Sequence, residues 1–469
     1  MSDPSADRPQ QIRSEATLFG HPPGLTFLFG TEMWERFSYY GMRSLLVLYM
    51  VGYLLRPDKA RDIIGLGGLR AGLESIFGRL SDQAFASQIY GFYTGFAYLT
   101  PILGGILADR LIGRTATVVL GASLMVAGHF MMAWDRLFLV ALLVLVIGVG
   151  TFKPNVTTQV GELYGPDDRR IDRAYSIFYA GINIGAFFAP LICGYLGERV
   201  AWHYGFIAAG VGMAIGLATY LAGRSYLPKS PPVRRVAPNV ESRSRSRASF
   251  ASMFMLFIPS ALWWAAYEQQ GNTIAIWIHQ SVDREVNLLF WNGAIPVTWF
   301  QSFNPILIFL ITPVLVVAWS HFAKAGREPT TITKLTTGCI LLSLAYVLPA
   351  AVTWISGENP ISWLWLLAFF VLVTIAELHF SPIGISLMSS IAPSGSRSSL
   401  MAVWFTSIFA GNFLAGYLGS LWEKFSQPGF FLIVASLGLA GALFTIAVRP
   451  LLARTLPSSH GATKIVESR

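Results

Sequence analysis

The chain has 469 residues, of which 54% are hydrophobic and only 13% are charged, whereas soluble domains carry about 25% charged residues. Its apolar residues come in long blocks, so the composition excludes an ordinary soluble protein and predicts one that crosses a membrane many times. Basic loops on one side of a membrane explain the net charge of +9 better than nucleic-acid binding does.

We expect about twelve membrane spans of roughly 20 residues each. Their approximate cores are 25–54, 82–110, 114–133, 137–163, 173–197, 203–223, 250–280, 298–322, 332–355, 361–391, 398–421 and 429–450. The polar residues 1–24 lack the apolar core of a signal peptide, so the first span would act as its own insertion signal. The apolar segment 284–300 contains Asn, Gly and Pro, and we interpret it as an outer loop with a short helix.

The first span contains an unusual number of ionisable residues. Glu32, Arg36, Tyr40 and Arg43 follow a spacing that places them on one helical face. A charged side chain at the centre of a membrane helix costs about 2.5–3.5 kcal/mol on insertion scales. The face must therefore line a polar cavity inside a helix bundle, which indicates a transporter of protons, of a charged solute, or of both.

A stretch rich in Pro, Ser and Arg divides the chain near its middle and predicts a flexible linker. Lys and Arg concentrate in the tails, in this linker and in loops on the same side, which predicts that both termini are cytoplasmic. We expect five parts: a cytoplasmic tail over 1–24, a six-helix bundle over 25–224, a cytoplasmic linker over 225–249, a second six-helix bundle over 250–452 and a cytoplasmic tail over 453–469.

The loop between the second and third spans reads GGILADRLIGR from Gly104 to Arg114. It resembles the signature loop of the major facilitator superfamily, in which Asp109 would cap or bridge a neighbouring helix. The resemblance implies an all-α membrane protein of about 12 transmembrane helices in two six-helix bundles around a central cavity, in which rocking of the halves exposes a site to either side.

A narrower resemblance begins in the first span, where residues 32–41 (EMWERFSYYG) look like the ExxERFxYYG motif of the proton-dependent oligopeptide transporters, also called the POT or peptide transporter family. Further matches to this family follow in chain order as far as the eleventh span. They are Gly150–Val156 (GTFKPNV), Phe178–Gly185 (FYAGINIG), Trp264–Gly271 (WAAYEQQG), Ser302–Pro305 (SFNP), Glu377–Pro382 (ELHFSP) and Trp404–Phe405.

The chain departs from this family's pattern in two places. The linker is too short and too polar for the two extra helices of many bacterial members, so we expect the twelve-span form. Animal peptide carriers place a proton-sensing His seven residues before the Tyr of a Tyr-Leu-Thr-Pro motif, where this chain has Gly91 before Tyr98. Proton coupling must then depend on carboxylates, with His379 as a weaker candidate.

From the residues and the resemblance we expect three overlapping sets of site residues. Those for proton coupling are Glu32, Glu35, Arg36, Lys153 and Glu268. Those for peptide binding are Arg43, Lys153, Asn183, Asn304, Glu377, Ser381, Tyr39, Tyr40, Tyr98, Trp264 and Trp404. Those for gate salt bridges between the halves are the pairs Arg43–Glu268, which the resemblance puts toward the outside, and Lys153–Glu377, which it puts toward the cytoplasm.

The physical reason for these roles is charge matching. A peptide has a cationic and an anionic end, and Glu377 opposite Arg43 and Lys153 would hold both. Asn183 and Asn304 would bind peptide amides or the amino terminus, or would only join helices. A purely structural ion cluster of Glu32, Glu35 and Arg36 is the alternative to a proton site.

The function expected from the resemblance is proton-coupled import of di- and tripeptides, with protons as the coupling ion and no other cofactor. No GxxxxGKS or GxxxxGKT loop and no metal-spaced His/Cys cluster occurs, so we expect neither ATP nor a metal to take part. The expected setting is a bacterial inner (plasma) membrane, with membrane lipids as partners and a monomeric chain. The alternatives are a relative that carries another small organic or anionic solute such as nitrate, and a membrane-embedded protein that transports nothing, such as a hydrolase, a receptor or a channel.

Overall fold

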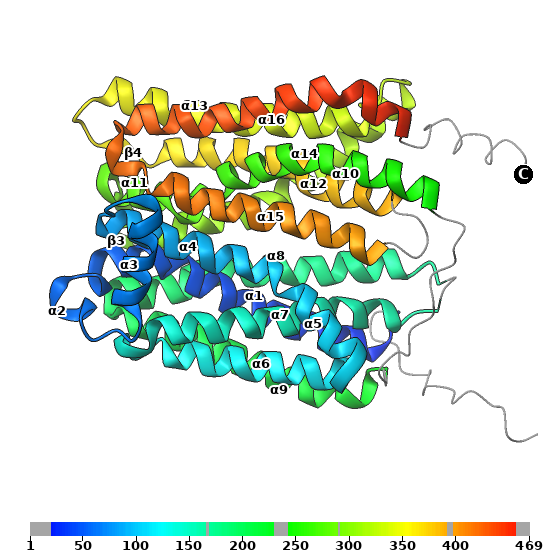
Figure 1. The fold of residues 1–469 in the computed structure, drawn as a ribbon, viewed down its shortest axis with the longest axis horizontal. Helices are drawn as coiled ribbons and strands as arrows, with labels where there is room; N and C mark the ends of the chain where they lie inside the picture. The colour runs from blue at the N-terminus through cyan, green and yellow to red at the C-terminus, as the bar shows by residue number, and fades with distance from the viewer. Residues whose placement is uncertain (1–19, 166–167, 229–242, 289–290, 392–396, 456–469) are drawn as a thin grey trace, which may run out of the picture.

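A computed structural model describes residues 20–165, 168–228, 243–288, 291–391 and 397–455. These residues form twelve long helical segments (Figure 1). The first six are α1 (Pro23–Tyr49), α4 (Asp82–Leu99) continued by α5 (Pro101–Leu107), α6 (Arg114–Met131), α7 (Phe138–Glu162), α8 (Ile171–Tyr195) and α9 (Trp202–Gly223). The last six are α10 (Arg243–Tyr267) continued by α11 (Thr273–Ser281), α12 (Phe303–Lys324), α13 (Thr331–Ser356), α14 (Leu364–Ile391), α15 (Arg397–Gly419) and α16 (Gln427–Thr455).

Shorter elements join these helices. They are the helices α2 (Pro57–Ala60) and α3 (Leu66–Phe77), the strands β1 (Val282–Asp283), β2 (Glu285–Leu288), β3 (Trp291–Ala294) and β4 (Ile361–Ser362), the π-helical turns η1 (Met50–Leu54), η2 (Ala108–Ile112) and η4 (Leu196–Val200), and the 3-10 turns η3 (Asp135–Leu137), η5 (Arg224–Tyr226), η7 (Glu268–Gly271), η8 (Val297–Ser302) and η9 (Trp422–Lys424). The strands and the short helices α2, α3 and α11 lie mostly at one end of the molecule (Figure 1). We call this end the hairpin end, after the antiparallel β2–β3 pair.

The helices are arranged as two bundles that follow the order of the chain. In the first bundle α1 packs on α8 and α9, and α6 packs on α7 and α9. In the second bundle α13 packs on α14 and α16, and α10 packs on α15 and α16. Contacts between the bundles run through α4 with α15 and through α8 with α12 and η8. The predicted tails and linker lie largely outside the described residues, because 1–19, 229–242 and 456–469 are not among them.

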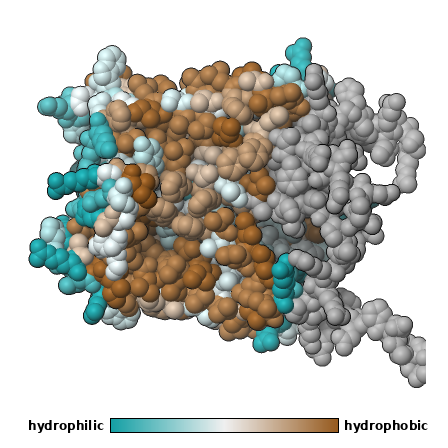
Figure 2. Space-filling view, in the orientation of Figure 1, coloured by the Kyte–Doolittle hydropathy of each residue, from teal (hydrophilic) through white to brown (hydrophobic). Residues whose placement is uncertain are grey.

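The surface of the bundle is suited to a bilayer. Eight of the described helices are long and apolar enough to cross a membrane by length and composition. Figure 2 shows a broad hydrophobic band across the helices and hydrophilic residues at the hairpin end. α1 is not one of the eight, since its four ionisable residues lower its apolar character, and the sequence identifies it as a span only through its flanking apolar residues.

Two connections differ from what the sequence predicts. Residues 55–81, expected as a loop, contain the two helices α2 and α3. Residues 284–300, expected as a loop with a short helix, begin with the β2–β3 hairpin and only then form the short helix η8. Gly293 in this hairpin has a positive φ of 126°, a backbone conformation that glycine adopts readily and other residues adopt only at a cost. Asp109, expected to bridge helices, lies 3.4 Å from Arg114 at the start of α6.

A close approach between the bundles leaves no room for a side chain at Gly91, the position at which the resemblance would put a proton-sensing histidine. A Cβ atom built on Gly91 of α4 would lie 2.6 Å from the Cα of Gly416 on α15 and 2.8 Å from the carbonyl oxygen of Asn412. Backbone therefore touches backbone at this crossing, as small residues permit between membrane helices. Any side chain at position 91 would push the two bundles apart.

We expect Gly91→Ala to destabilise the protein by about 1–3 kcal/mol, the usual cost of overpacking, and to reduce transport because α4 and α15 can no longer approach. Gly105→Ala is the matched control, since nothing lies within 4 Å of a Cβ there. Thermal unfolding in detergent measures both variants. Equal melting temperatures for the two variants would contradict the close contact.

Candidate functional site

A cavity of about 300 Å³ lies between the two bundles. The charged face of α1 opens onto it, because Glu32, Arg36, Tyr40 and Arg43 all line it. A 27-residue helix that begins at Pro23 carries them, and no glycine or proline interrupts it between Glu32 and Tyr40. The spacing therefore predicted this face correctly.

The cavity gathers most of the expected site residues, from both bundles. Besides the four residues of α1, those lining it are Tyr98, Lys153, Asn183, Trp264, Glu268, Asn304, Glu377, Ser381 and Trp404. Glu35 and Tyr39 do not line it. Tyr39 is only 4% exposed and stacks on Tyr93 with ring centroids 6.3 Å apart, so it packs within the first bundle instead of forming a side-chain pocket.

Two carboxylates share one guanidinium at the cavity wall. Arg36 Nε lies 3.1 Å from Glu32 Oε1 and in direct contact with Glu35 Oε2. All three side chains are at most 4% exposed. Glu32 Oε2 and Glu35 Oε1 are buried without a hydrogen-bond partner. Arg36 Nη2 is likewise buried without a partner, and unsatisfied polar atoms are costly in such a place. The two carboxylates also carry one negative charge more than the single guanidinium offsets.

Lys153 supplies a cation on the neighbouring helix. Its Nζ lies 4.5 Å from the ring centroid of Tyr98, a distance suited to a cation–π contact. Pro154 follows directly within α7, and it removes one backbone hydrogen bond of that helix. Both Lys153 and Glu32 line the same cavity, so the lysine can respond to a change of charge in the α1 cluster.

Glu377 is held by neutral donors of the second bundle. Tyr267 and Asn304 each donate a hydrogen bond of 2.8 Å to its Oε2 atom. Asn304 also donates to Thr374, at 3.2 Å. No Lys153–Glu377 ion pair forms among the described residues, so this expected bridge is absent from the conformation seen here; each side chain has taken a neutral partner within its own bundle.

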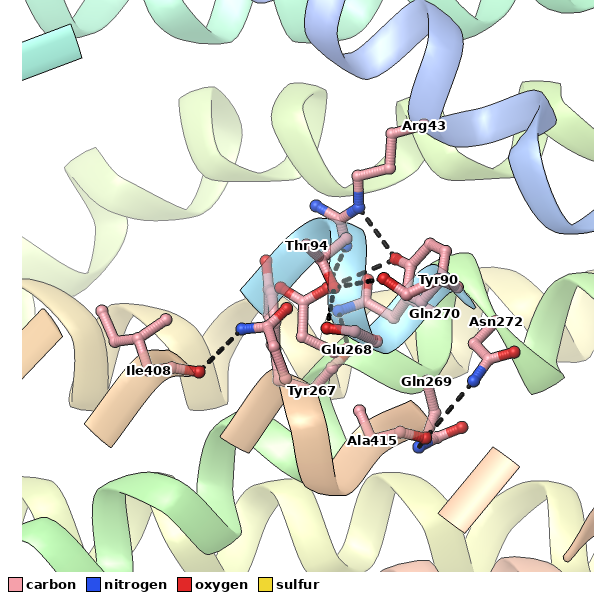
Figure 3. Close-up of polar contacts among 12 residues, drawn as sticks. Arg43, Tyr90, Thr94, Tyr267, Glu268, Gln269, Gln270, Asn272, Ile408 and Ala415 are labelled. Atoms are coloured by element: carbon pink, nitrogen blue, oxygen red, sulfur yellow. Dashed lines mark hydrogen bonds and ion pairs between the residues drawn. The ribbon is translucent and has the colours of Figure 1, made fainter. Parts of the chain in front are cut away.

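Arg43 and Glu268 do form the expected ion pair across the bundles. Arg43 Nη2 lies 2.5 Å from Glu268 Oε2. Tyr90 completes the contact: it accepts a hydrogen bond of 2.8 Å from Arg43 Nε and donates one of 3.3 Å to Glu268. Figure 3 shows Arg43 reaching down from α1 to this group. Glu268 is only 1% exposed, which makes this a desolvated contact between the bundles.

A break in a helix places Glu268. The long helix α10 stops at Tyr267, continues as the 3-10 turn η7 and resumes as α11. Gln269 and Asn272 use their side-chain amides to bond the backbone oxygen of Ala415 on α15, at 3.0 and 3.3 Å (Figure 3). These two bonds tie the broken segment to α15. At the break itself, the Tyr346 hydroxyl and the Gln270 amide donate to the carbonyls of Ala266 and Tyr267, at 2.7 and 3.0 Å, as backbone groups at membrane depth require.

Several expected residues have local partners. Asn183 bonds the carbonyl of Tyr179 on its own helix at 3.1 Å, although it lines the cavity. His379 does not line the cavity; it stands edge-on to Trp319 with centroids 5.3 Å apart and bonds the carbonyl of Ile375. That position argues against His379 as a proton carrier.

Sequence reasoning missed part of the polar lining. Tyr179, Tyr267, Gln270 and Gln301 all line the cavity, and Tyr90 joins the gate pair. The first three lie inside motifs already singled out, so their position beside Asn183 and Glu268 was a usable signal. Tyr90 offered no such signal, because only the crossing of α4 with α1 brings it there.

The sequence resembles those of known proteins along most of its length. A family model described as the POT family matches residues 115–245 and 233–433. The chain is 32% identical to a di-/tripeptide transporter of Lactococcus lactis over 94% of this chain and 98% of the relative. It is 31% identical to a peptide transporter of Yersinia enterocolitica over 86% of this chain and 88% of the relative.

Solved structures of this family resemble the whole chain. A peptide transporter POT in complex with sulfate has a TM-score of 0.79 and 29% identity, over 94% of this chain and 97% of that one. A POT family transporter in complex with 5-aminolevulinic acid has a TM-score of 0.79 and 27% identity, over 93% of this chain and 98% of that one. The predicted all-α fold of two six-helix bundles is thereby confirmed, and the protein is a multi-pass membrane protein.

Breaking the Arg43–Glu268 pair from one side should leave an unpaired buried charge. We expect Glu268→Gln and Arg43→Gln each to lower the free energy of unfolding by about 3–5 kcal/mol. The double variant should lose clearly less than the two single losses together, since neither charge remains. Denaturant unfolding in detergent measures this coupling.

The exposed pair Arg170–Asp168 at 2.7 Å is the matched control. Asp168→Asn should cost about 1 kcal/mol or less. Additive losses in the Arg43 and Glu268 variants would mean that the two side chains do not depend on each other.

Proposed function

The chain belongs to the POT family, and from this premise we propose that it is a proton-coupled symporter that imports di- and tripeptides by alternating access. Relatives with 31–32% identity are named di-/tripeptide or peptide transporters. A solved relative is described in complex with a thioalcohol conjugated peptide. The observation that carries the proposal is the cavity between the bundles, which presents buried charges of both signs.

The charges of the cavity match a small zwitterion. Arg43 and Lys153, from the first bundle, would hold a carboxylate. Glu377, from the second bundle, would hold an amino terminus, with Asn304 already bonded to it at 2.8 Å and Asn183 on the facing wall. The relative crystallised with 5-aminolevulinic acid, a molecule with one amine and one carboxylate, supports this arrangement of charges. The apolar and aromatic lining, Trp264 and Trp404 included, would receive the peptide side chains.

Counting the charges in and beside the cavity supports proton coupling. The cavity and the cluster behind it contain three cations and four carboxylates, which leaves one negative charge. They are Arg36, Arg43 and Lys153 against Glu32, Glu35, Glu268 and Glu377. A zwitterionic peptide adds no net charge, so one proton would bring the loaded site to neutrality. A neutral core crosses between conformations at lower electrostatic cost than a charged one.

The proton gradient is sufficient for uphill import, with no other cofactor. One pH unit supplies about 1.4 kcal/mol per proton, and 100 mV adds about 2.3 kcal/mol. One or two protons would therefore accumulate a peptide many-fold. Glu32 is the carboxylate of the α1 cluster that lines the cavity, so it is positioned to exchange a proton with the site.

The two gate pairs support alternating access. Arg43–Glu268 is made and Lys153–Glu377 is not, as expected if one end of the cavity is shut while the other is free to open. By the positive-inside rule, the basic loops support an orientation with the hairpin end outside and both termini in the cytoplasm. The setting proposed is a bacterial inner membrane, with the chain acting as a monomer among membrane lipids.

Uptake into proteoliposomes tests the proposal. An inward proton gradient should drive accumulation of a labelled dipeptide, with competition by tripeptides and little competition by amino acids. If nitrate competes and peptides do not, the protein is a carrier of small anions and the peptide proposal is wrong. Glu377 favours a substrate with an amino group.

The first variants address coupling. Glu32→Gln and Glu35→Gln should each abolish accumulation driven by a proton gradient while keeping exchange of labelled for unlabelled peptide, because exchange moves no net protons. The exposed Glu423→Gln on η9 is the control and should behave as wild type. Normal uphill uptake by both cluster variants would remove the cluster from proton coupling.

The second variants address the amino terminus of the peptide. Acetylating the dipeptide amine should weaken competition about tenfold or more for wild type, the size of a charged hydrogen bond. In Glu377→Gln the same modification should have little effect, since the carboxylate charge that would bind the amine is gone. Equal losses in both proteins would place the amine elsewhere.

A further inference from the structure

The two bundles meet a second time at the hairpin end, away from the Arg43–Glu268 pair. There η8, from the second bundle, lies against α8 and η4 of the first. Trp299 Nε1 donates to the carbonyl of Leu191 at 3.0 Å, and Ser302 Oγ donates to that of Phe187 at 2.8 Å. Every one of these bonds runs from a donor of η8 to an acceptor of α8.

Glu198 of η4 makes the most concentrated contact in this interface. Its two carboxylate oxygens accept hydrogen bonds from the backbone N–H groups of Val297 and Thr298, at 2.8 and 2.9 Å. Its Oε1 also accepts one from the Thr298 hydroxyl at 2.7 Å. The first N–H groups of a helix have no partner within it and favour a negative charge. Glu198 therefore caps η8, and the helix it caps belongs to the other bundle.

The surroundings of Glu198 hold the two segments in register. Arg199 donates across the interface to the carbonyl of Ala294, whereas Arg284 donates to that of Ile295 at 2.8 Å within the second bundle and fixes the chain just before η8. Gly194 of α8 touches the Thr298 side chain so closely that a Cβ atom would overlap with it. The absence of a side chain at Gly194 is thus what allows Glu198 to reach the start of η8.

We propose that Glu198 is a latch that holds the hairpin end of the cavity shut, independently of the Arg43–Glu268 pair. This inference uses the alternating-access part of the proposed function, because only a transporter that opens at this end must break the contact. When the bundles separate there, the carboxylate and both backbone N–H groups must part. The three bonds are then exchanged for bonds to water, which the partly exposed position of Glu198 allows.

Distance measurement between the bundles tests the latch. Tyr204 on α9 and Trp354 on α13 are 55% and 78% exposed and lie toward the hairpin end on opposite bundles. Cysteines at these two positions can carry spin labels, since the native Cys193 and Cys339 are both buried. Double electron–electron resonance in nanodiscs, without peptide or a proton gradient, then reports opening.

Glu198→Ala should raise the ratio of long to short distances about tenfold or more, as expected for loss of charged hydrogen bonds. Thr298→Val removes one of the three bonds and should give a smaller shift in the same direction. Glu198→Gln keeps an acceptor and should fall between wild type and Glu198→Ala. Glu423→Gln, which removes an exposed charge outside the interface, should match wild type.

Independence from the first gate is tested by combination. Glu268→Gln alone should also lengthen the distances, and adding Glu198→Ala should lengthen them further. The latch would be overturned if the distance distribution of Glu198→Ala superimposed on that of wild type while the distribution of Glu268→Gln shifted. If Glu198→Ala does not fold, the distributions of Glu198→Gln and Thr298→Val take its place in this test. Because the readout uses no substrate, failure of peptide uptake leaves this result unaffected.

Discussion

The structure depends on one electrostatic constraint: seven ionisable groups lie in or beside a cavity in the middle of a membrane bundle. Each would be expensive alone, and each is tolerable only near a partner. Arg36 forms ion pairs with Glu32 and Glu35 within α1, whereas Arg43 forms one with Glu268 of the opposite bundle. The set contains one carboxylate more than it contains cations, and under the proposed function a proton would supply the missing positive charge.

Close backbone contact lets the bundles bring these groups together. Gly91 against Gly416 removes side chains from the crossing of α4 with α15. The break at η7 turns Glu268 toward Arg43 and Tyr90, and two side-chain amides next to the break bond the carbonyl of Ala415 on α15. Packing and charge pairing therefore act on the same seam, so a change in one alters the geometry of the other.

The sequence predicted the all-α fold and every charged residue that lines the cavity, because membrane spans and motif spacing are local signals. The charged face of α1 followed from helical periodicity alone. Tyr90 and the η8–Glu198 contact could not be predicted, since they depend on which helices cross. The Lys153–Glu377 pair stays a prediction. It is absent from this conformation, in which Tyr98 faces Lys153 while Tyr267 and Asn304 hold Glu377. The β2–β3 hairpin was missed because its apolar residues carry no clear period.

The two polar contacts between the bundles, Arg43 with Glu268 and Glu198 with η8, differ in how they depend on water. Arg43–Glu268 is almost fully desolvated, so separating it exposes two charges that need new partners, such as the substrate carboxylate or a proton. Glu198 is only partly buried, and water can replace the backbone N–H groups it binds. Under the proposed function, a ligand in the cavity would act on the Arg43–Glu268 pair, which lines it. The Glu198 contact with η8 would favour the closed conformation whether or not a ligand is bound. A site sealed by both would open rarely when empty and would not require either contact to be strong.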